Sequence, residues 1–220
     1  LKKDDNYKLM FGVVDELSAM DWDAVKVASY DCASFPLLND LKNRFKKLFV
    51  STGATYDEEI EKAASILKGT DFSFLHCVTI YPTPLNKLDL SRVDYLKKFS
   101  PHAGFSDHTL VSRDGIKAAA AALYYGAEII ERHFTILGAD QTKDGPVSIS
   151  PNLLKELVGL AHMNKEDLKK YIEERVPEFE TMIGTCQRKL SAEELLNRDY
   201  YRGRFATKTS DGKTIYNWEE

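Results

Sequence analysis

The sequence has few cysteines and no long hydrophobic segment, and both absences narrow the class of protein. Its three cysteines, Cys32, Cys77 and Cys186, are odd in number and widely spaced. This spacing argues against a disulfide framework or a CxxC zinc knuckle and favours free thiols, so we expect a cytoplasmic protein. No apolar run approaches the ~20 residues that span a bilayer, and the opening LKKDDNYKLMFG lacks the apolar stretch of a signal peptide. We therefore expect no membrane segment.

The sequence also lacks a large excess of charge of either sign. The formal net charge is −4, with 29% charged and 43% hydrophobic residues, which is ordinary for a globular domain with a sizeable core. Without a basic excess we expect no nucleic-acid partner, and any phosphate site must be a local feature. No GxGxxG motif follows the first apolar run, which argues against a dinucleotide-binding fold.

Short apolar runs alternate with amphipathic segments along most of the chain. The apolar runs predict strands at 8–14, 24–29, 48–52, 72–78, 103–106 and 127–134. Helical spacing predicts helices at Thr55–Leu67, at Asp114–Tyr125 before Gly126, and from Pro151 to about Val176. This rhythm indicates an α/β fold with parallel strands, and about six strands suit either an open sheet or part of an eight-stranded barrel.

The rhythm stops at about residue 176. We expect residues 1–176 to form a partial (β/α) barrel and residues 177–220 to be a tail or linker. Within that tail, the SAEE capping box predicts a short helix at Ser191–Arg198. The chain opens on Leu1 rather than on methionine, so we expect it to be a fragment of a longer protein.

Polar residues end nearly every predicted strand, and (β/α) barrels collect their active sites at these ends. The candidate site residues are Lys26, Ser29, Asp31, Ser51, Thr79, Tyr81, Ser106, His108, Glu131 and His133. His108 and His133 follow consecutive strands, so the two imidazoles can meet and would suit a divalent metal such as Mn²⁺. A pair of structural histidines is the alternative.

The remaining candidates include donors that suit an anion. Lys26 alternates with its flanking valines, so it points to the other face of its strand. A lysine inside a barrel is costly unless it meets an anion, and Ser29, Ser51 and Ser106 would add hydroxyl donors around a phosphate or carboxylate. Serines that only cap the following helices are the alternative.

Five strand-end strings occur in one order along the chain: DAVKVASYD, FVSTGATYDEEI, LHCVTIYPTP, GFSDHT and GAEIIERHFT. Together they resemble the sialic acid synthase family, which includes N-acetylneuraminate synthase and relatives that make legionaminic and spore-coat sugars. The resemblance implies a TIM (β/α)8 barrel that condenses phosphoenolpyruvate with an N-acetylated amino sugar, such as N-acetylmannosamine. The implied products are phosphate and a nine-carbon, sialic-acid-type 2-keto acid, which makes the protein a transferase.

The resemblance also implies a metal and its ligands. His108 and His133 match the metal-ligating histidines of the family, with Mn²⁺ expected first and Mg²⁺ or Co²⁺ as alternatives. Asp31 matches an acidic residue that assists proton transfer, and Glu131 stands beside a metal ligand. Together with Lys26, these two carboxylates are the expected catalytic residues.

The implied substrate contacts come from the same strings. Phosphoenolpyruvate contacts match Lys26, Ser29, Ser51 and Ser106, and Thr79 stands where relatives carry a small polar residue. Tyr81 matches the tyrosine of the YPTP motif, near the sugar. The resemblance further implies a homodimer for the full-length protein.

The chain departs from the family pattern at three places. Relatives begin with two further strands that nothing here matches, so the barrel is expected to be N-terminally incomplete and this fragment inactive alone. Val147 stands where relatives carry an aspartate that touches the sugar, which leaves the acceptor sugar open. The antifreeze-like domain that ends many relatives is not matched.

Two other functions fit the same residues. One is a non-catalytic barrel remnant that acts as an interaction module. The other is a barrel lyase or aldolase that uses Lys26 as a Schiff base, which would need no metal. The barrel fold by itself does not decide among these functions.

Overall fold

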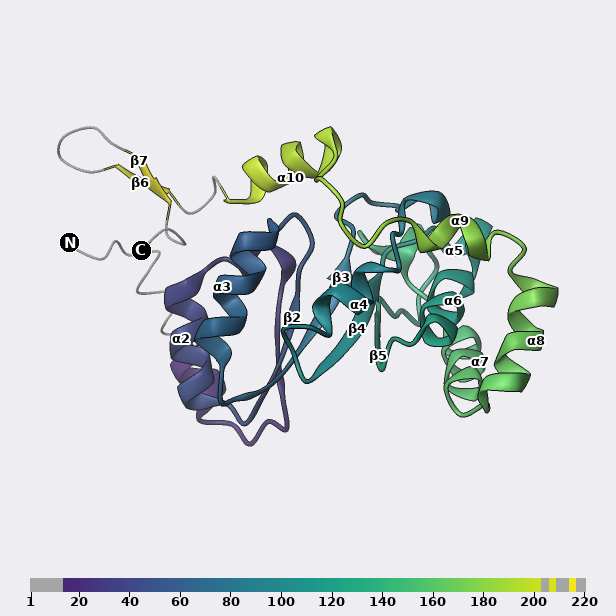
Figure 1. Cartoon of the computed structure of the whole chain (residues 1–220), viewed down its shortest axis with the longest axis horizontal. Helices are drawn as coiled ribbons and strands as arrows, with labels where there is room; N and C mark the ends of the chain where they lie inside the picture. The colour runs from purple at the N-terminus through teal and green to yellow at the C-terminus, as the bar shows by residue number, and fades with distance from the viewer. Residues whose placement is uncertain (1–13, 203–205, 209–213, 217–220) are drawn as a thin grey trace. The chain divides into compact units, whose positions relative to one another are not determined.

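The computed structural model describes residues 14–202, 206–208 and 214–216. The chain divides into two compact units, the first comprising residues up to Ser73 with those from Leu190, and the second Phe74–Lys189. Strands β1 to β5 belong to one five-stranded sheet and follow one another in chain order (Figure 1). No helix in the described part of the chain is long and apolar enough to cross a membrane.

The first unit contains two parallel strands and the helices that follow them. Its elements are β1 (Val25–Val27), η1 (Ser29–Asp31), α2 (Phe35–Arg44), β2 (Lys47–Ser51), α3 (Asp57–Leu67), α10 (Ala192–Arg202), β6 (Ala206–Lys208) and β7 (Thr214–Tyr216). β1 and β2 pair in parallel with Lys26 opposite Phe49, whereas β6 and β7 pair antiparallel. Helices α2 and α3 pack against each other, as Figure 1 shows.

Local sequence explains both of these packed helices. The acidic run Asp57–Glu59 opens α3, where negative charge favours the helix N-terminus, and Ile60 and Leu67 bury one face. The predicted helix at Thr55–Leu67 is therefore confirmed. Helix α2 was not predicted, although Pro36 in its first turn and the buried Leu41 on its apolar stripe are helix signals.

The helix expected from the SAEE motif is also confirmed, as α10. Its capping box is formed in both directions: Ser191 N donates to Glu194 Oε2 at 3.0 Å, and Glu194 N donates to Ser191 Oγ at 3.2 Å. Further along α10, Arg198 donates to both carboxylate oxygens of Glu59, at 2.6 and 2.9 Å, and to the Ala54 carbonyl at 2.6 Å. α10 is thereby attached to the turn that precedes α3.

The second unit contains the remaining strands and most of the helices. Its elements are the end of β3 (Asp71–Cys77), η2 (Leu85–Lys87), α4 (Arg92–Leu96), β4 (His102–Asp107), α5 (Val111–Asp114), α6 (Lys117–Tyr125), β5 (Ile129–Arg132), η3 (Gly145–Val147), α7 (Pro151–Ala161), α8 (Lys165–Arg175) and α9 (Phe179–Ile183). β4 and β5 pair in parallel. α6 contacts both strands and also α7 and α8, as Figure 1 shows.

These elements confirm an α/β fold with parallel strand pairs. Five of the six predicted strands appear, and the sixth, at 8–14, lies outside the described residues except for Val14, which is helical, as residues 15–18 are. Strands that follow chain order favour a barrel over a doubly wound sheet, whose strand order reverses at a switch point. A barrel of eight strands stays a prediction.

The single helix expected from Pro151 to about Val176 is wrong, because the chain forms two helices there. α7 ends at Ala161, and Asn164 then caps α8 by accepting a hydrogen bond from Asp167 N at 2.9 Å. A side chain that satisfies a free N–H at a new helix start stabilises a break that apolar periodicity alone does not indicate.

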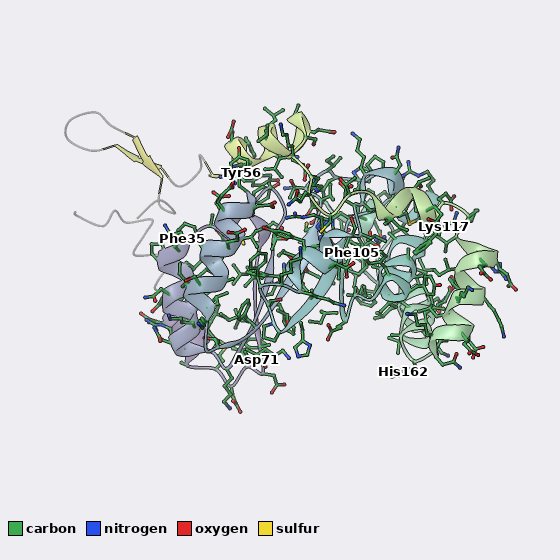
Figure 2. The ribbon with its side chains drawn as sticks, viewed as in Figure 1. Phe35, Tyr56, Asp71, Phe105, Lys117 and His162 are labelled. Carbon is green, nitrogen blue, oxygen red and sulfur yellow. The ribbon has the colours of Figure 1, made fainter. Side chains whose placement is uncertain are left out.

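Close packing around β4 fixes this part of the second unit. Phe105, labelled in Figure 2, is only 1% exposed, and the alanine run Ala118–Ala122 of α6 is buried. At Gly104 an added Cβ would lie 2.4 Å from the Ile129 carbonyl oxygen and 2.7 Å from a methyl carbon of Leu75. Only glycine fits at that position of the strand.

We predict that Gly104→Ala destabilises the protein by about 2 to 4 kcal/mol, because backbone of the neighbouring strand must move. Gly159→Ala is the matched control: it lies within α7, with nothing within 4 Å of an added Cβ. That control should stabilise by about 0.5 to 1 kcal/mol. Urea unfolding measures both, and equal effects would contradict the packing argument.

We also predict that Arg198→Met releases α10 and lowers the free energy of unfolding by about 1 to 3 kcal/mol, since the poorly exposed carboxylate of Glu59 loses its ion pair with Arg198. Arg44→Met, at a more exposed pair with Asp40, is the control and should have a smaller effect. Limited proteolysis should cut the Arg198 variant near α10 faster than the control. Equal cleavage rates would show that Arg198 does not anchor the helix.

Candidate active site

Two histidines meet where β4 and β5 end. His108 and His133 directly follow these strands, and their ring centroids lie 5.2 Å apart. The register pairs Ser106 with Glu131. Because side chains alternate along a strand, these two residues share a face with the histidines. The predicted proximity of His108 and His133 is thus a feature of the structure, and both belong to the second unit.

The backbone of both histidines is held by neighbouring loops. Thr83 N donates to the His108 carbonyl at 2.9 Å, and Ile149 N donates to the His133 carbonyl at 2.8 Å. Two residues before Ile149, Val147 ends the short helix η3 and is 4% exposed, so it packs as an apolar residue. The histidine backbones are therefore anchored from outside their own strands.

Tyr81 and Cys77 flank the His108 imidazole. Tyr81 Oη is hydrogen-bonded to His108 Nε2 at 2.7 Å, and the two rings pack with centroids 4.1 Å apart. Cys77 Sγ lies 3.7 Å from His108 Nδ1. Tyr81 is 50% exposed whereas Cys77 is buried, so a ligand could reach the phenol side of the ring. Tyr81 was predicted for the site; Cys77 was missed, although it ends β3 in the LHCVT string.

The other face of the same strand ends carries a buried ion pair. Asp107 lies opposite Arg132 in the register, and their side chains are 0% and 3% exposed and in contact. Neither residue is among the predicted site residues, although Asp107 is a polar residue at the end of its strand. What indicates that Asp107 and Arg132 are partners is the register of β4 and β5, which pairs position 107 with position 132.

The other predicted residues are distributed between the two units. In the first unit Ser51 ends β2 and is 0% exposed, Ser29 is 7% exposed, Asp31 ends η1 and is half-buried, and Lys26 of β1 is exposed. In the second unit Thr79 is 1% exposed. Their roles stay predictions.

The histidine pair can be tested against the chemistry of a metal site. Two imidazole nitrogens are suitable donors for a divalent transition metal. No group of three His, Cys, Asp or Glu side chains with metal-binding geometry occurs in the parts of the chain that the structure describes. Two imidazoles by themselves would leave the remaining coordination positions to water or substrate oxygens, as in an open site, and a metal at this pair stays a prediction.

Parallel α/β units with polar side chains gathered after the strand ends define the general class of this protein. Within that class, the model of the NeuB family matches residues 10–173. The chain is 35% identical over 153 residues to the N,N'-diacetyllegionaminic acid synthase of Campylobacter jejuni, covering 66% of this chain and 44% of that protein. It is 31% identical over 202 residues to the Bacillus subtilis spore coat polysaccharide biosynthesis protein SpsE, covering 89% and 53%.

Solved structures agree with these matches. The sialic acid synthetase of Leptospira borgpetersenii is 29% identical with a TM-score of 0.64, over 86% of this chain and 61% of that one. Bacillus subtilis SpsE, at 24% identity, shares the fold with a TM-score of 0.72 over 93% and 60%. The chain belongs to the NeuB family, the sialic acid synthase family expected from its motifs. It spans about half the length of the curated relatives that it matches.

We predict that Tyr81→Phe changes the side-chain ¹⁵N signal of His108 Nε2, because the phenol hydroxyl is its hydrogen-bond partner. The free energy of unfolding should change by less than about 1 kcal/mol, since the bond is solvent-accessible and the ring packing remains. Long-range ¹H–¹⁵N spectra of histidine-labelled protein measure this. Tyr171→Phe, which removes a hydroxyl bonded to Glu156, should leave His108 unchanged. An unchanged His108 signal in Tyr81→Phe would contradict the contact.

Proposed function

We propose that the protein is a sugar-acid synthase that condenses phosphoenolpyruvate with an N-acetylated amino sugar in its open aldehyde form. The observation that carries the proposal is the meeting of His108 and His133 after adjacent strands, in a chain of the NeuB family. The legionaminic, pseudaminic and N-acetylneuraminate-9-phosphate synthases among its relatives support the same reaction class.

The reaction forms one carbon–carbon bond; at the carbon that carries the phosphate group it also forms one carbon–oxygen bond to water and breaks the carbon–oxygen bond to phosphate. The methylene carbon of phosphoenolpyruvate attacks the aldehyde carbon, and the aldehyde oxygen takes up a proton. Water adds to the cation-like carbon that carries the phosphate group and loses a proton; the resulting hydroxyl loses its second proton as phosphate leaves with the bridging oxygen. A 2-keto acid remains, so the reaction needs no oxidant or reductant.

Each step asks for a different kind of side chain. Lys26, with Ser29, Ser51 and Ser106, would hold the phosphate and carboxylate of phosphoenolpyruvate, because ammonium and hydroxyl donors suit these anions. Asp31 or Glu131 would accept the proton from the attacking water. These roles come from the family resemblance.

His108, His133 and Tyr81 would bind and activate the sugar. His108 and His133 would hold a divalent metal, Mn²⁺ first among the candidates. When bound, such a metal supplies Lewis-acid polarisation of the sugar aldehyde. Tyr81, which is half-exposed and hydrogen-bonded to His108, would contact the sugar, a role that comes from the family resemblance. The buried Val147 offers no polar atom from its side chain, so an acceptor that differs from N-acetylmannosamine fits the proposal.

We predict that the complete gene product releases phosphate from phosphoenolpyruvate only with Mn²⁺ and an acetamido sugar, tested with N-acetylmannosamine and with 2,4-diacetamido sugars. His108→Ala and His133→Ala should each lower kcat/KM by about a hundredfold or more, since each removes a metal donor. His162→Ala, at the end of α7, is the control and should keep activity.

Two outcomes would overturn the proposal. Absence of sugar-dependent phosphate release from a folded, Mn²⁺-binding protein would exclude the synthase. Metal-independent turnover, with borohydride trapping of substrate on Lys26, would assign the Schiff-base lyase instead. The expected homodimer, the cytoplasmic location and the inactivity of these 220 residues alone stay predictions.

A further inference from the structure

We infer that Arg132 and Asp107 form a positioning pair that fixes the turn carrying His108 and ties it to the strand end carrying His133. The inference deepens the proposed synthase function, on which its meaning for catalysis rests. Its physical basis is a set of contacts on the face of β4 and β5 opposite to the histidines.

The guanidinium of Arg132 makes several contacts at once. Nη1 donates to Thr109 Oγ1 at 3.0 Å and also contacts the Asp107 carboxylate. Nη2 donates to the Thr109 carbonyl at 3.0 Å and to the Gly115 carbonyl at 3.4 Å. One side chain therefore connects β5 with the end of β4, the turn after it and the end of α5.

These contacts hold the residues on both sides of His108 in the sequence. Asp107 and Thr109 are its two neighbours, and they are joined to each other because Thr109 N donates to Asp107 Oδ1 at 2.8 Å. The His108 carbonyl is held by Thr83 N at 2.9 Å. With both flanking residues and its own carbonyl fixed, the imidazole is attached to a backbone that has little freedom to turn.

The burial of both charged side chains indicates that this pair does more than stabilise the fold. The side chains of Asp107 and Arg132 are 0% and 3% exposed, so both charges lose nearly all their hydration. A buried ion pair is often no more stabilising than well-packed apolar residues of similar volume. The planar fork of Arg132 instead fixes geometry, because its donors reach three acceptors in set directions.

Three variants of the complete gene product test the inference. Arg132→Lys keeps the positive charge but loses the planar guanidinium, and Arg132→Met removes both. Thr109→Val removes the hydroxyl acceptor with little change of side-chain shape. Arg188→Lys is the matched control, at a poorly exposed pair with Asp89 elsewhere in the second unit. The first readout is the side-chain ¹⁵N spectrum of His108 in metal-free protein, the second is the Mn²⁺ dissociation constant from electron paramagnetic resonance, and the third is kcat against KM.

We expect Arg132→Lys to change the His108 signal and to weaken Mn²⁺ binding by about ten- to a hundredfold, as loss of outer-shell support commonly does. Thr109→Val should weaken Mn²⁺ binding by about two- to tenfold, the worth of one hydrogen bond. The loss in activity should fall on kcat, with the KM for phosphoenolpyruvate changed by less than about threefold. The Arg188→Lys control should leave all three readouts unchanged.

One result would overturn the inference: Arg132→Lys and Thr109→Val lower the melting temperature but leave the His108 signal and the Mn²⁺ affinity as they are in the control. The pair would then stabilise the fold without positioning His108. If Arg132→Met does not fold, the other two variants still decide. A wild-type protein without synthase activity would contradict the proposed function, whereas the metal-free spectra would still test the positioning of His108.

Discussion

Parallel hydrogen bonding between β4 and β5 sets the register on which the second unit depends. It places Ser106 beside Glu131 on one face and Asp107 beside Arg132 on the other. A slip of one residue would reverse the two faces, because side chains alternate along a strand. Such a slip would separate Asp107 from its partner, at the cost of an unpaired charge away from water. The ion pair therefore protects the register that brings the histidine motifs together.

Small residues make this register compatible with tight packing. Gly104 allows β4 to approach β5 and Leu75 at distances that no side chain permits. The buried alanines Ala118–Ala122 let α6 pack on the same strands. Helix α6 then ends at Gly126, whose φ of +118° suits only glycine without strain. Small residues thus permit close packing of the strands and of the helix that covers them, while Arg132 and Asp107 are charged residues buried in the same unit.

Much of the fold could be predicted because buried parallel strands are nearly continuous in apolar residues. The ends of the predicted strands then identified His108 and His133 as site candidates, and this step needed no knowledge of packing. The link between Asp107 and Arg132 could not be predicted in this way, since a charged residue in a sequence carries no mark of burial. Its partner follows only from the register, which is a property of two strands and not of either alone.

Other misses have similar physical reasons. The break between α7 and α8 depends on the capping of one N–H group by Asn164, while the apolar periodicity continues across it. Helix α2 carries several charged and polar residues among Leu37, Leu38 and Leu41, which hid its buried stripe. The bond between Tyr81 and His108 joins residues 27 positions apart, and the resemblance to a family predicted a role for each without predicting the contact.

The two faces of β4 and β5 therefore carry different constraints. In the proposed function the residues beside the histidines meet substrate, and a single exchange there, such as Tyr81→Phe, is expected to change stability little. On the opposite face, loss of either Asp107 or Arg132 alone leaves a buried charge without its partner, which is far costlier than loss of both. Variation is consequently easier on the face that selects the substrate than on the face that holds the histidines in place. Under the proposed function, this asymmetry would let substrate contacts change while the arrangement of the two imidazoles stays the same.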